Sequence, residues 1–182
     1  MRPLFDDDAA KGASAVTRDY EFELDGGGDR APVLSAFGGK LTTYRKLSEH
    51  ALDKLAPTFP EMSDRWTATA PLPGGDMEDA DFDRWFARFA ARRPWLGDDL
   101  ARHYGRCYGR DAETLLDGAA AHADLGRWFG GLLYEREARW LMEREWAMTA
   151  EDILTRRTKH GLFLTAEETA AFAAWISAEA TV

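Results

Sequence analysis

The residues whose types and spacing suggest chemistry lie between positions 33 and 46, in the segment VLSAFGGKLTTYRK. An apolar run ends in Gly38-Gly39, and a helical pattern begins at Lys40. The backbone N–H groups at a helix N-terminus are unpaired and carry partial positive charge, so acidic residues are usual there. Here the first two turns are basic, and no acid appears before Glu49. The pattern is typical of a helix end that holds an anion.

Glycine and hydroxyl side chains add to this prediction. Glycine lets a ligand approach the backbone, while Lys40, Thr42 and Thr43 offer one charge and two hydroxyl donors. The segment is not a Walker A loop, because Leu34 stands where that motif needs glycine and Leu41 stands where it needs serine or threonine. The alternative is a tight Gly-Gly corner followed by solvated basic residues, and charge and spacing alone leave the two interpretations equal.

Two arginines near the N-terminus could join such a site. Arg2 lies in the segment RPL, and Arg18 lies in TRD, directly before the first predicted strand. A guanidinium group binds phosphate or carboxylate through paired hydrogen bonds. Each arginine taken alone is equally compatible with an ordinary surface position.

The composition limits the classes of protein to which the chain can belong. Its net charge of −9 argues against a general nucleic-acid binder, because such proteins present a basic excess or a basic face. No apolar run approaches the roughly 20 residues that span a bilayer. His50, His103, His122, His160 and the single Cys107 show no metal-binding spacing, so we expect no metal site.

Two strands and a helix are predicted to position the Gly-Gly-Lys segment. Alternating residues predict a strand over Asp19–Leu24, glycines 26–28 predict a turn, and Pro32–Phe37 predicts a second strand. A helix should follow from about Lys40 to Leu55. Because two strands alone are marginally stable in water, we expect this region to need a larger sheet.

The remainder of the chain has a helical pattern. We expect an α+β fold in which residues 1–56 form the short β segment and helix, residues 57–75 form a Pro- and Gly-rich linker, and residues 76–182 form an all-α domain. In that domain, helices are predicted over residues 81–93, 98–108, 132–146 and 166–178, with Thr165 and Glu168 as a capping box before the last.

Several segments resemble a known enzyme family. RPLFDDD, TRDYEFEL and LSAFGGKLTTYRKLSEHALDKL, in this order, are similar to the C-terminal part of the FAD-dependent (aerobic, respiratory) glycerol-3-phosphate dehydrogenases. The resemblance continues through PLPGGD, RRPWL, ARHYGRCYG and the run from Asp124 to Leu162. It covers almost the whole chain, and the nine-residue segment FGGKLTTYR with its collinear flanks is highly specific.

The resemblance implies that residues 1–56 complete a glutathione-reductase-like FAD domain and its substrate cap, and that the family's helical C-terminal domain follows. In that family the Gly-Gly-Lys helix end faces the flavin ring. The matching cofactor-binding positions in this chain are Gly38, Gly39, Lys40, Leu41 and Thr42. A positive helix end at this place stabilises the negative charge of reduced flavin.

The resemblance also implies a substrate and a reaction. Arg2, Arg18 and Lys40 match substrate-site positions, where we expect them to hold the phosphate group, with Arg2 and Lys40 as catalytic residues that polarise the hydroxyl group. The expected reaction is the oxidation of sn-glycerol 3-phosphate to dihydroxyacetone phosphate by hydride transfer to flavin N5. The electrons would pass to quinone, or to oxygen in a sister oxidase branch.

One departure from the family is large. The family opens with a G-x-G-x-x-G dinucleotide fingerprint, and this sequence does not contain that spacing. We therefore expect a C-terminal fragment that needs an N-terminal FAD-binding half as its partner and is inactive alone. The complete enzyme should be cytoplasmic, peripheral to the inner membrane, with a homodimer as one option. The alternatives are a helical protein-interaction module without catalytic activity and, on weaker grounds, a stand-alone phosphate-binding domain.

Overall fold

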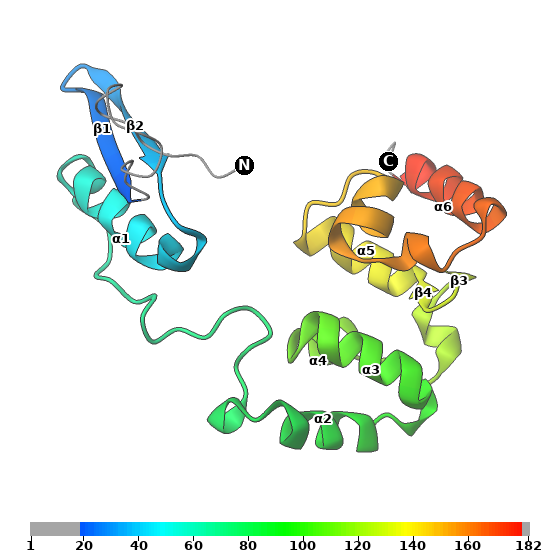
Figure 1. Cartoon of the computed structure of the whole chain (residues 1–182). Coiled ribbons are helices and arrows are strands. Elements are labelled where there is room, and N and C mark those ends of the chain that lie inside the picture. Colours follow the sequence, from blue (N-terminus) through cyan, green and yellow to red (C-terminus); the bar gives the residue numbers. More distant parts are fainter. Residues whose placement is uncertain (1–18, 180–182) are drawn as a thin grey trace, which may run out of the picture. The chain divides into compact units, whose positions relative to one another are not determined.

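A computed structural model describes residues 19–179 of the chain (Figure 1). The contacts divide the chain into two compact units, Met1–Ala70 and Pro71–Val182. The boundary lies inside the segment 57–75 that the sequence indicates as a linker. Each unit is therefore built from one continuous stretch of the sequence.

The first unit contains the β-hairpin that the alternating residues predict. β1 (Tyr20–Gly27) and β2 (Arg30–Gly38) pair antiparallel, with Leu24 opposite Leu34. The turn lies at Gly28 and Asp29, and the φ of +63° at Gly28 is one that glycine adopts readily. It comes later than predicted, because the two preceding glycines continue the first strand instead of forming the turn.

A helix packs against this hairpin (Figure 1). It begins with the 3-10 turn Leu41–Thr43, continues as α1 (Tyr44–Leu55) and ends in a second 3-10 turn, Ala56–Thr58. The ring of His50 on α1 lies edge-on to that of Phe22, with 5.4 Å between the ring centroids. The helix predicted between Lys40 and Leu55 is confirmed, with its first turn tightened to 3-10 geometry.

None of the residues described in the first unit is fully buried. Many of its large apolar side chains are exposed, including Leu41 at 90% and Tyr44 at 55%. Others on the hairpin, on α1 and beyond it are Leu24, Val33, Phe37, Leu52, Phe59, Met62 and Trp66. A gathering of exposed apolar side chains is typical of a surface that packs against other protein. The first unit thus has the character expected of a strand pair that needs a larger sheet.

The second unit is mostly helical, and the α+β class predicted for the chain is confirmed. Its regular elements are α2 (Phe82–Ala91), α3 (Gly97–Tyr108), α4 (Asp111–Leu115), β3 (Trp128–Gly130), β4 (Leu133–Tyr134), α5 (Glu135–Arg144) and α6 (Ala166–Glu179). Short helical turns are Glu78–Ala80, Pro94–Leu96, His122–Leu125, the π-helical Asp152–Arg157, and His160–Leu162.

Aromatic residues form much of the core of the second unit. Phe89 from α2, Tyr104 from α3 and Phe172 from α6 are among its largest fully buried side chains. The predicted capping box of α6 is confirmed: Glu168 accepts a hydrogen bond from the Thr165 backbone N–H at 2.8 Å, and its own N–H donates to the Thr165 hydroxyl at 3.2 Å. The aromatic pattern in the sequence therefore reflects core packing.

The prediction of an unbroken helix over residues 132–146 is wrong at both ends. β4 pairs antiparallel with β3, so α5 begins only at Glu135, and the second unit contains a small hairpin besides its helices. Gly130, the last residue of β3, and Gly131, which follows it in the turn, make this possible, because both adopt positive φ. At the other end, Trp146 has a φ of +53°, which α-helix does not allow. Among the described residues, none of the helices is long and apolar enough to cross a membrane.

Candidate functional site

The Gly-Gly corner before α1 is tightly built. Gly38 and Gly39 have φ angles of +77° and +101°, a region that other residues rarely adopt. The Gly39 N–H donates to the Asp19 carbonyl at 3.2 Å, which ties the corner to the start of β1. A Cβ atom on Gly39 would lie 3.0 Å from the Leu47 side chain. The corner therefore depends on glycine, and it fixes where the helix begins.

Lys40 occupies the N-cap position that follows this corner. Its backbone is extended, and its carbonyl accepts hydrogen bonds from both the N–H and the hydroxyl group of Thr43, each at 3.0 Å. The Lys40, Leu41 and Thr42 side chains are exposed, and the first turn contains no acid. Within residues 19–179, Lys40 has no ion-pair partner. The helix end thus presents a lysine and its first N–H groups to a ligand.

The basic character of this helix end is smaller than the sequence suggests. Arg45 pairs with Glu49 at 2.8 Å. The Thr67 hydroxyl donates to the same carboxylate, and this hydrogen bond together with the charge of Arg45 holds the pKa of Glu49 below its usual value. Arg45 is therefore paired within the first unit, whereas Lys40, the residue next to Gly39, has no ion-pair partner among residues 19–179.

Arg2 and Arg18 lie outside the residues that the structure describes. Gly38, Gly39, Lys40, Leu41 and Thr42 are brought together at one corner, as their adjacency in the sequence requires. That Arg2 and Arg18 share a substrate site with Lys40 stays a prediction.

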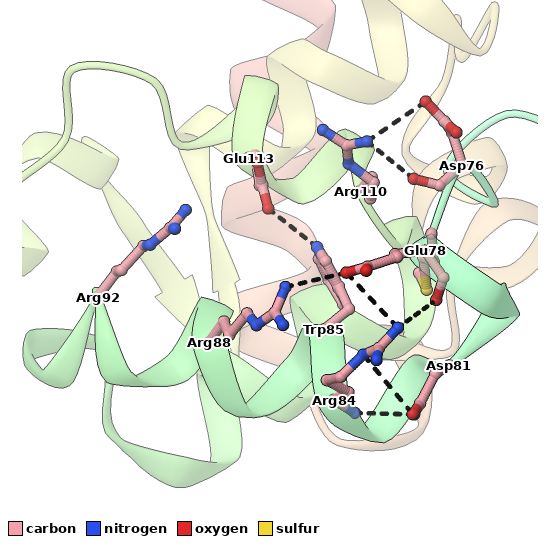
Figure 2. A pocket seen from close by; sticks show the side chains of 10 residues that line it. Asp76, Glu78, Asp81, Arg84, Trp85, Arg88, Arg92, Arg110 and Glu113 are labelled. Carbon is pink, nitrogen blue, oxygen red and sulfur yellow. Dashed lines mark hydrogen bonds and ion pairs between the residues drawn. The ribbon is translucent and has the colours of Figure 1, made fainter.

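The second unit contains a cavity of about 260 Å³ lined by arginines and acids (Figure 2). Arg84 pairs with Glu78 at 3.5 Å, Arg88 with the same carboxylate at 3.4 Å, and Arg110 with Asp76 at 3.3 Å. Trp85 donates its indole N–H to Glu113 at 2.9 Å. Since acids that line the cavity already pair with these three arginines, the arrangement stabilises the surface between α2 and α4 and gives no specific support for an anion site.

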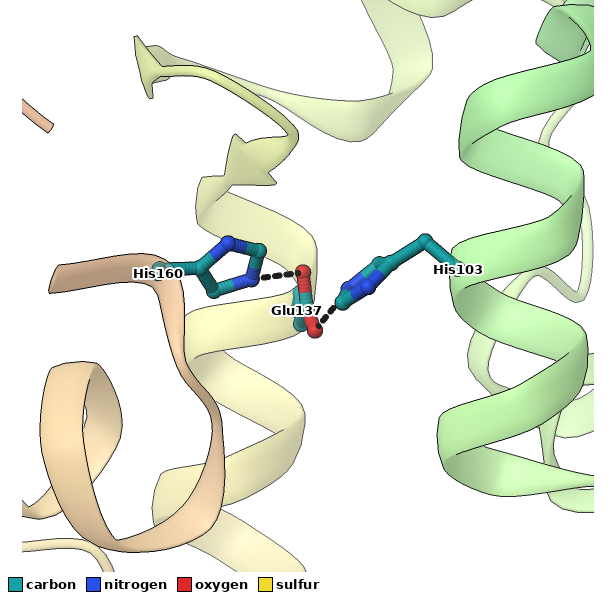
Figure 3. A group of neighbouring side chains, drawn as sticks. All are labelled: His103, Glu137 and His160. Atoms are coloured by element: carbon teal, nitrogen blue, oxygen red, sulfur yellow. Dashed lines mark hydrogen bonds and ion pairs between the residues drawn. The ribbon is translucent and has the colours of Figure 1, made fainter. Parts of the chain in front are cut away.

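Three titratable side chains that sequence reasoning did not connect meet inside the second unit (Figure 3). The Glu137 carboxylate accepts a hydrogen bond from His103 at 2.7 Å and contacts His160 at 3.2 Å. Burial raises the pKa of Glu137, but the hydrogen bonds from the two histidines outweigh it and hold the pKa at about 2. Burial likewise lowers the pKa of His103, but the contacts with Cys107 and Glu137 raise it to about 10.

The sequence did not predict this cluster, because its members are far apart in the chain. His103 and Glu137 are 34 positions apart, and Glu137 and His160 are 23 positions apart. One signal was available. Glu137 precedes Leu141 by four positions, so it lies on the apolar face of α5. A charged residue on a buried helix face requires a polar partner.

Comparison with known proteins identifies the second unit. Residues 65–180 match the model of the family described as the C-terminal domain of alpha-glycerophosphate oxidase. The chain belongs to this family. The arginine-lined cavity and the His103–Glu137–His160 cluster both lie within the matched C-terminal domain, whereas the Gly-Gly-Lys corner precedes it.

Several known proteins are similar to this chain over most of its length. D-erythritol 1-phosphate dehydrogenase of Brucella abortus (strain 2308) is 50% identical over 96% of this chain and 34% of its own length. Aerobic glycerol-3-phosphate dehydrogenase of Escherichia coli (strain K12) is 46% identical over 97% and 35%. Alpha-glycerophosphate oxidase of Streptococcus pneumoniae serotype 4 (strain ATCC BAA-334 / TIGR4) is 30% identical over 83% and 25%. The chain spans about a third of the length of the first two relatives.

Proposed function

We propose that this chain is the C-terminal part of an FAD-dependent dehydrogenase that oxidises sn-glycerol 3-phosphate to dihydroxyacetone phosphate. The observation that carries the proposal is the 46% identity with aerobic glycerol-3-phosphate dehydrogenase over 97% of the chain, which includes the Gly-Gly-Lys corner. The electrons pass to quinone, and the complete enzyme is cytoplasmic and associates peripherally with the inner membrane.

The corner before α1 has the features that a flavin requires. Gly38 and Gly39 adopt positive φ angles that build a tight corner before the helix, and Lys40 is exposed and unpaired within residues 19–179. FAD, when bound, supplies the hydride acceptor. In this proposal Gly38, Gly39, Leu41 and Thr42 contact the cofactor through the corner and the first helical turn, and the positive helix end favours negative charge on it.

The substrate would be held by cations of the first unit. Arg2 and Arg18 hold the phosphate group, because a guanidinium group forms paired hydrogen bonds to phosphate oxygens. Lys40, together with Arg2, polarises the secondary hydroxyl of the substrate. The isolated chain is inactive in this proposal, since its sequence contains no dinucleotide fingerprint to hold the adenine and pyrophosphate groups.

A second candidate substrate is D-erythritol 1-phosphate, favoured by the 50% identity with the Brucella abortus dehydrogenase. Both compounds are polyol phosphates, so the same cations can hold either phosphate group. The relative called alpha-glycerophosphate oxidase makes oxygen the second candidate acceptor. Substrate choice would then depend on groups outside residues 38–42.

Reconstitution tests the proposal. The 182-residue chain is co-expressed with the N-terminal two thirds of the E. coli relative, and the product is purified through a tag on this chain. We expect a yellow protein that reduces an artificial acceptor dye or a quinone when given a polyol phosphate. Comparing kcat/KM for the two phosphates then selects the substrate, and oxygen consumption separates a dehydrogenase from an oxidase. If the two parts never associate, a helical interaction module becomes the better interpretation.

A further inference from the structure

Two histidines and one glutamate converge in the interior of the second unit. His103 comes from α3, Glu137 from α5, and His160 from the short turn His160–Leu162. Glu137 is fully buried, His160 is 4% exposed, and His103 is partly buried. Figure 3 shows the two imidazoles directed at the carboxylate from opposite sides. The three ligand-type side chains therefore share one small region of the protein interior.

We propose that His103, Glu137 and His160 bind a divalent transition-metal ion, with Zn²⁺ as the preferred occupant. Two imidazoles and one carboxylate are a common donor set for zinc, whereas Mg²⁺ and Ca²⁺ prefer oxygen ligands throughout. The site is independent of the flavin and polyol-phosphate chemistry proposed for the first unit, and it requires no residue outside the described part of the chain.

The spacing of the ligand atoms is close to what an ion needs. Zinc bonds of about 2.0–2.1 Å in a tetrahedral arrangement place ligand atoms about 3.3 Å apart. Here the His103 Nε2 lies 2.7 Å from one Glu137 oxygen, and the His160 Nε2 lies 3.2 Å from the other. One donor atom from each residue can be chosen so that all three lie within 4.8 Å of one another. Small rotations of the side chains would therefore open the cluster around an ion.

Neighbouring side chains hold the three ligands in orientation. The Tyr108 hydroxyl donates to the Glu137 carboxylate at 2.6 Å. On the far side of the His103 ring, Nδ1 lies 3.7 Å from the Cys107 Sγ, which leaves Nε2 directed at the cluster. Metal-binding histidines and carboxylates are usually held by such outer hydrogen bonds, which fix the ring orientation and the tautomer. These contacts orient the side chains before an ion binds, and the ion would displace to solvent the proton that His103 donates to Glu137.

A cavity next to the cluster leaves room for a further ligand. Its volume is about 500 Å³, and His103 and His160 both form part of its wall. The rest of its lining combines Arg157 and Lys159 with Cys107, Thr158 and apolar residues. Three protein ligands beside an open cavity resemble the zinc sites that keep their fourth position for water or a small anion.

Metal titration of the purified, tag-free 182-residue chain tests the proposal. The protein is freed of metal with a chelator, dialysed, and titrated with Co²⁺ while the visible bands of four-coordinate cobalt are recorded. Competition with Zn²⁺ then gives the relative affinity. We expect one ion per chain, displacement of cobalt by zinc, and a higher melting temperature with zinc.

Three variants test whether the metal binds at the His103–Glu137–His160 cluster. Glu137→Gln and His160→Gln should weaken zinc binding by at least about 100-fold, since each removes a direct ligand. His122→Gln is the matched control, because His122 is an exposed histidine of the same unit, 3.3 Å from the Tyr134 hydroxyl, and should bind zinc like the original chain. His160→Gln keeps a polar side chain of similar size, so it carries the test if Glu137→Gln fails to fold, as judged by circular dichroism.

Two results would overturn the proposal. One is the absence of four-coordinate cobalt bands at saturating Co²⁺. The other is an affinity for zinc that is the same in folded His160→Gln and in the original chain, because binding would then occur elsewhere.

Discussion

Replacing Glu137 with glutamine tests the electrostatics of the second unit in the metal-free protein. The carboxylate is fully buried and lies within hydrogen-bonding distance of Tyr108 at 2.6 Å, His103 at 2.7 Å and His160 at 3.2 Å. Glutamine has nearly the same volume, but it is uncharged and has only one acceptor oxygen. The variant therefore removes a buried negative charge and leaves the cavity around it unchanged in size.

The expected loss follows from the pairing with His103. A pKa raised from 6.5 to about 10 in the folded state corresponds to about 4 kcal/mol of stability at pH 7. The lowered pKa of Glu137 reports the same pairing from the other partner, so it is not added. Breaking a buried ion pair costs about 3–5 kcal/mol in other proteins. Because the amide keeps part of the hydrogen bonding, we expect a loss of about 3 kcal/mol, or about 10–15 °C in Tm.

The effect should depend on pH with a definite sign. The pKa of Glu137 is lowered in the folded state, so its contribution is present above about pH 4.5 and is lost as the pH falls toward about 2. The pKa of His103 is raised, so its contribution is complete below about pH 6.5 and is lost as the pH rises through about 10. The difference in stability between Glu137→Gln and the original chain should therefore be largest between about pH 4.5 and 6.5.

Urea unfolding followed by tryptophan fluorescence measures this difference, since six of the seven tryptophans lie in the second unit. The experiment is run with a chelator at pH 3, 6 and 9.5. Glu143→Gln is the matched control, because Glu143 is an exposed glutamate on the same helix and should change stability by less than about 0.5 kcal/mol. A loss below about 1 kcal/mol, or a difference that does not vary with pH, would refute the assignment of a buried ion pair.

Three further predictions follow from single positions. Under the role proposed for Lys40 in polarising the substrate hydroxyl, Lys40→Ala in the reconstituted enzyme should lower kcat by about 100-fold; steady-state kinetics measure it. Gly39→Ala should destabilise the corner by about 1–3 kcal/mol, because its φ is +101° and its Cβ would crowd Leu47; faster proteolysis of the first unit reports it. Tyr104→Phe should leave stability unchanged or raise it slightly, since the buried hydroxyl has no hydrogen-bond partner within residues 19–179; thermal unfolding measures it.

The Lys40 and Tyr104 predictions each have a control at a nearby position. Lys46→Ala removes an exposed lysine farther along α1, and an equal fall in kcat would argue against a special role for Lys40. Tyr108→Phe removes a hydroxyl that does donate to Glu137, so it should cost about 1–2 kcal/mol where Tyr104→Phe costs nothing. Similar effects of the two tyrosine variants would contradict this interpretation of the core.

Local patterns in the sequence were enough to predict most elements. The alternation before the glycines predicts the hairpin, and the helical pattern over residues 81–93 predicts α2, whose buried face includes Trp85 and Phe89. Capping residues predict where α6 begins. These signals succeed because each depends on neighbours within a few positions. The helix predicted over residues 132–146 failed because β4 is stabilised by pairing with β3, a contact that helical spacing does not encode.

The candidate functional residues also fall into those that the sequence predicts and those that only the structure brings together. The sequence by itself determined the Gly-Gly-Lys corner, since its residues are adjacent and positive φ at both glycines follows from local backbone geometry. Only the tertiary structure decided the His103–Glu137–His160 cluster, because packing of α3 against α5 and the turn at His160 brings together side chains that lie 34 and 23 residues apart. Likewise, only the structure showed that Arg45 forms an ion pair with Glu49. Contacts over such distances depend on how the core packs, and no short motif records that.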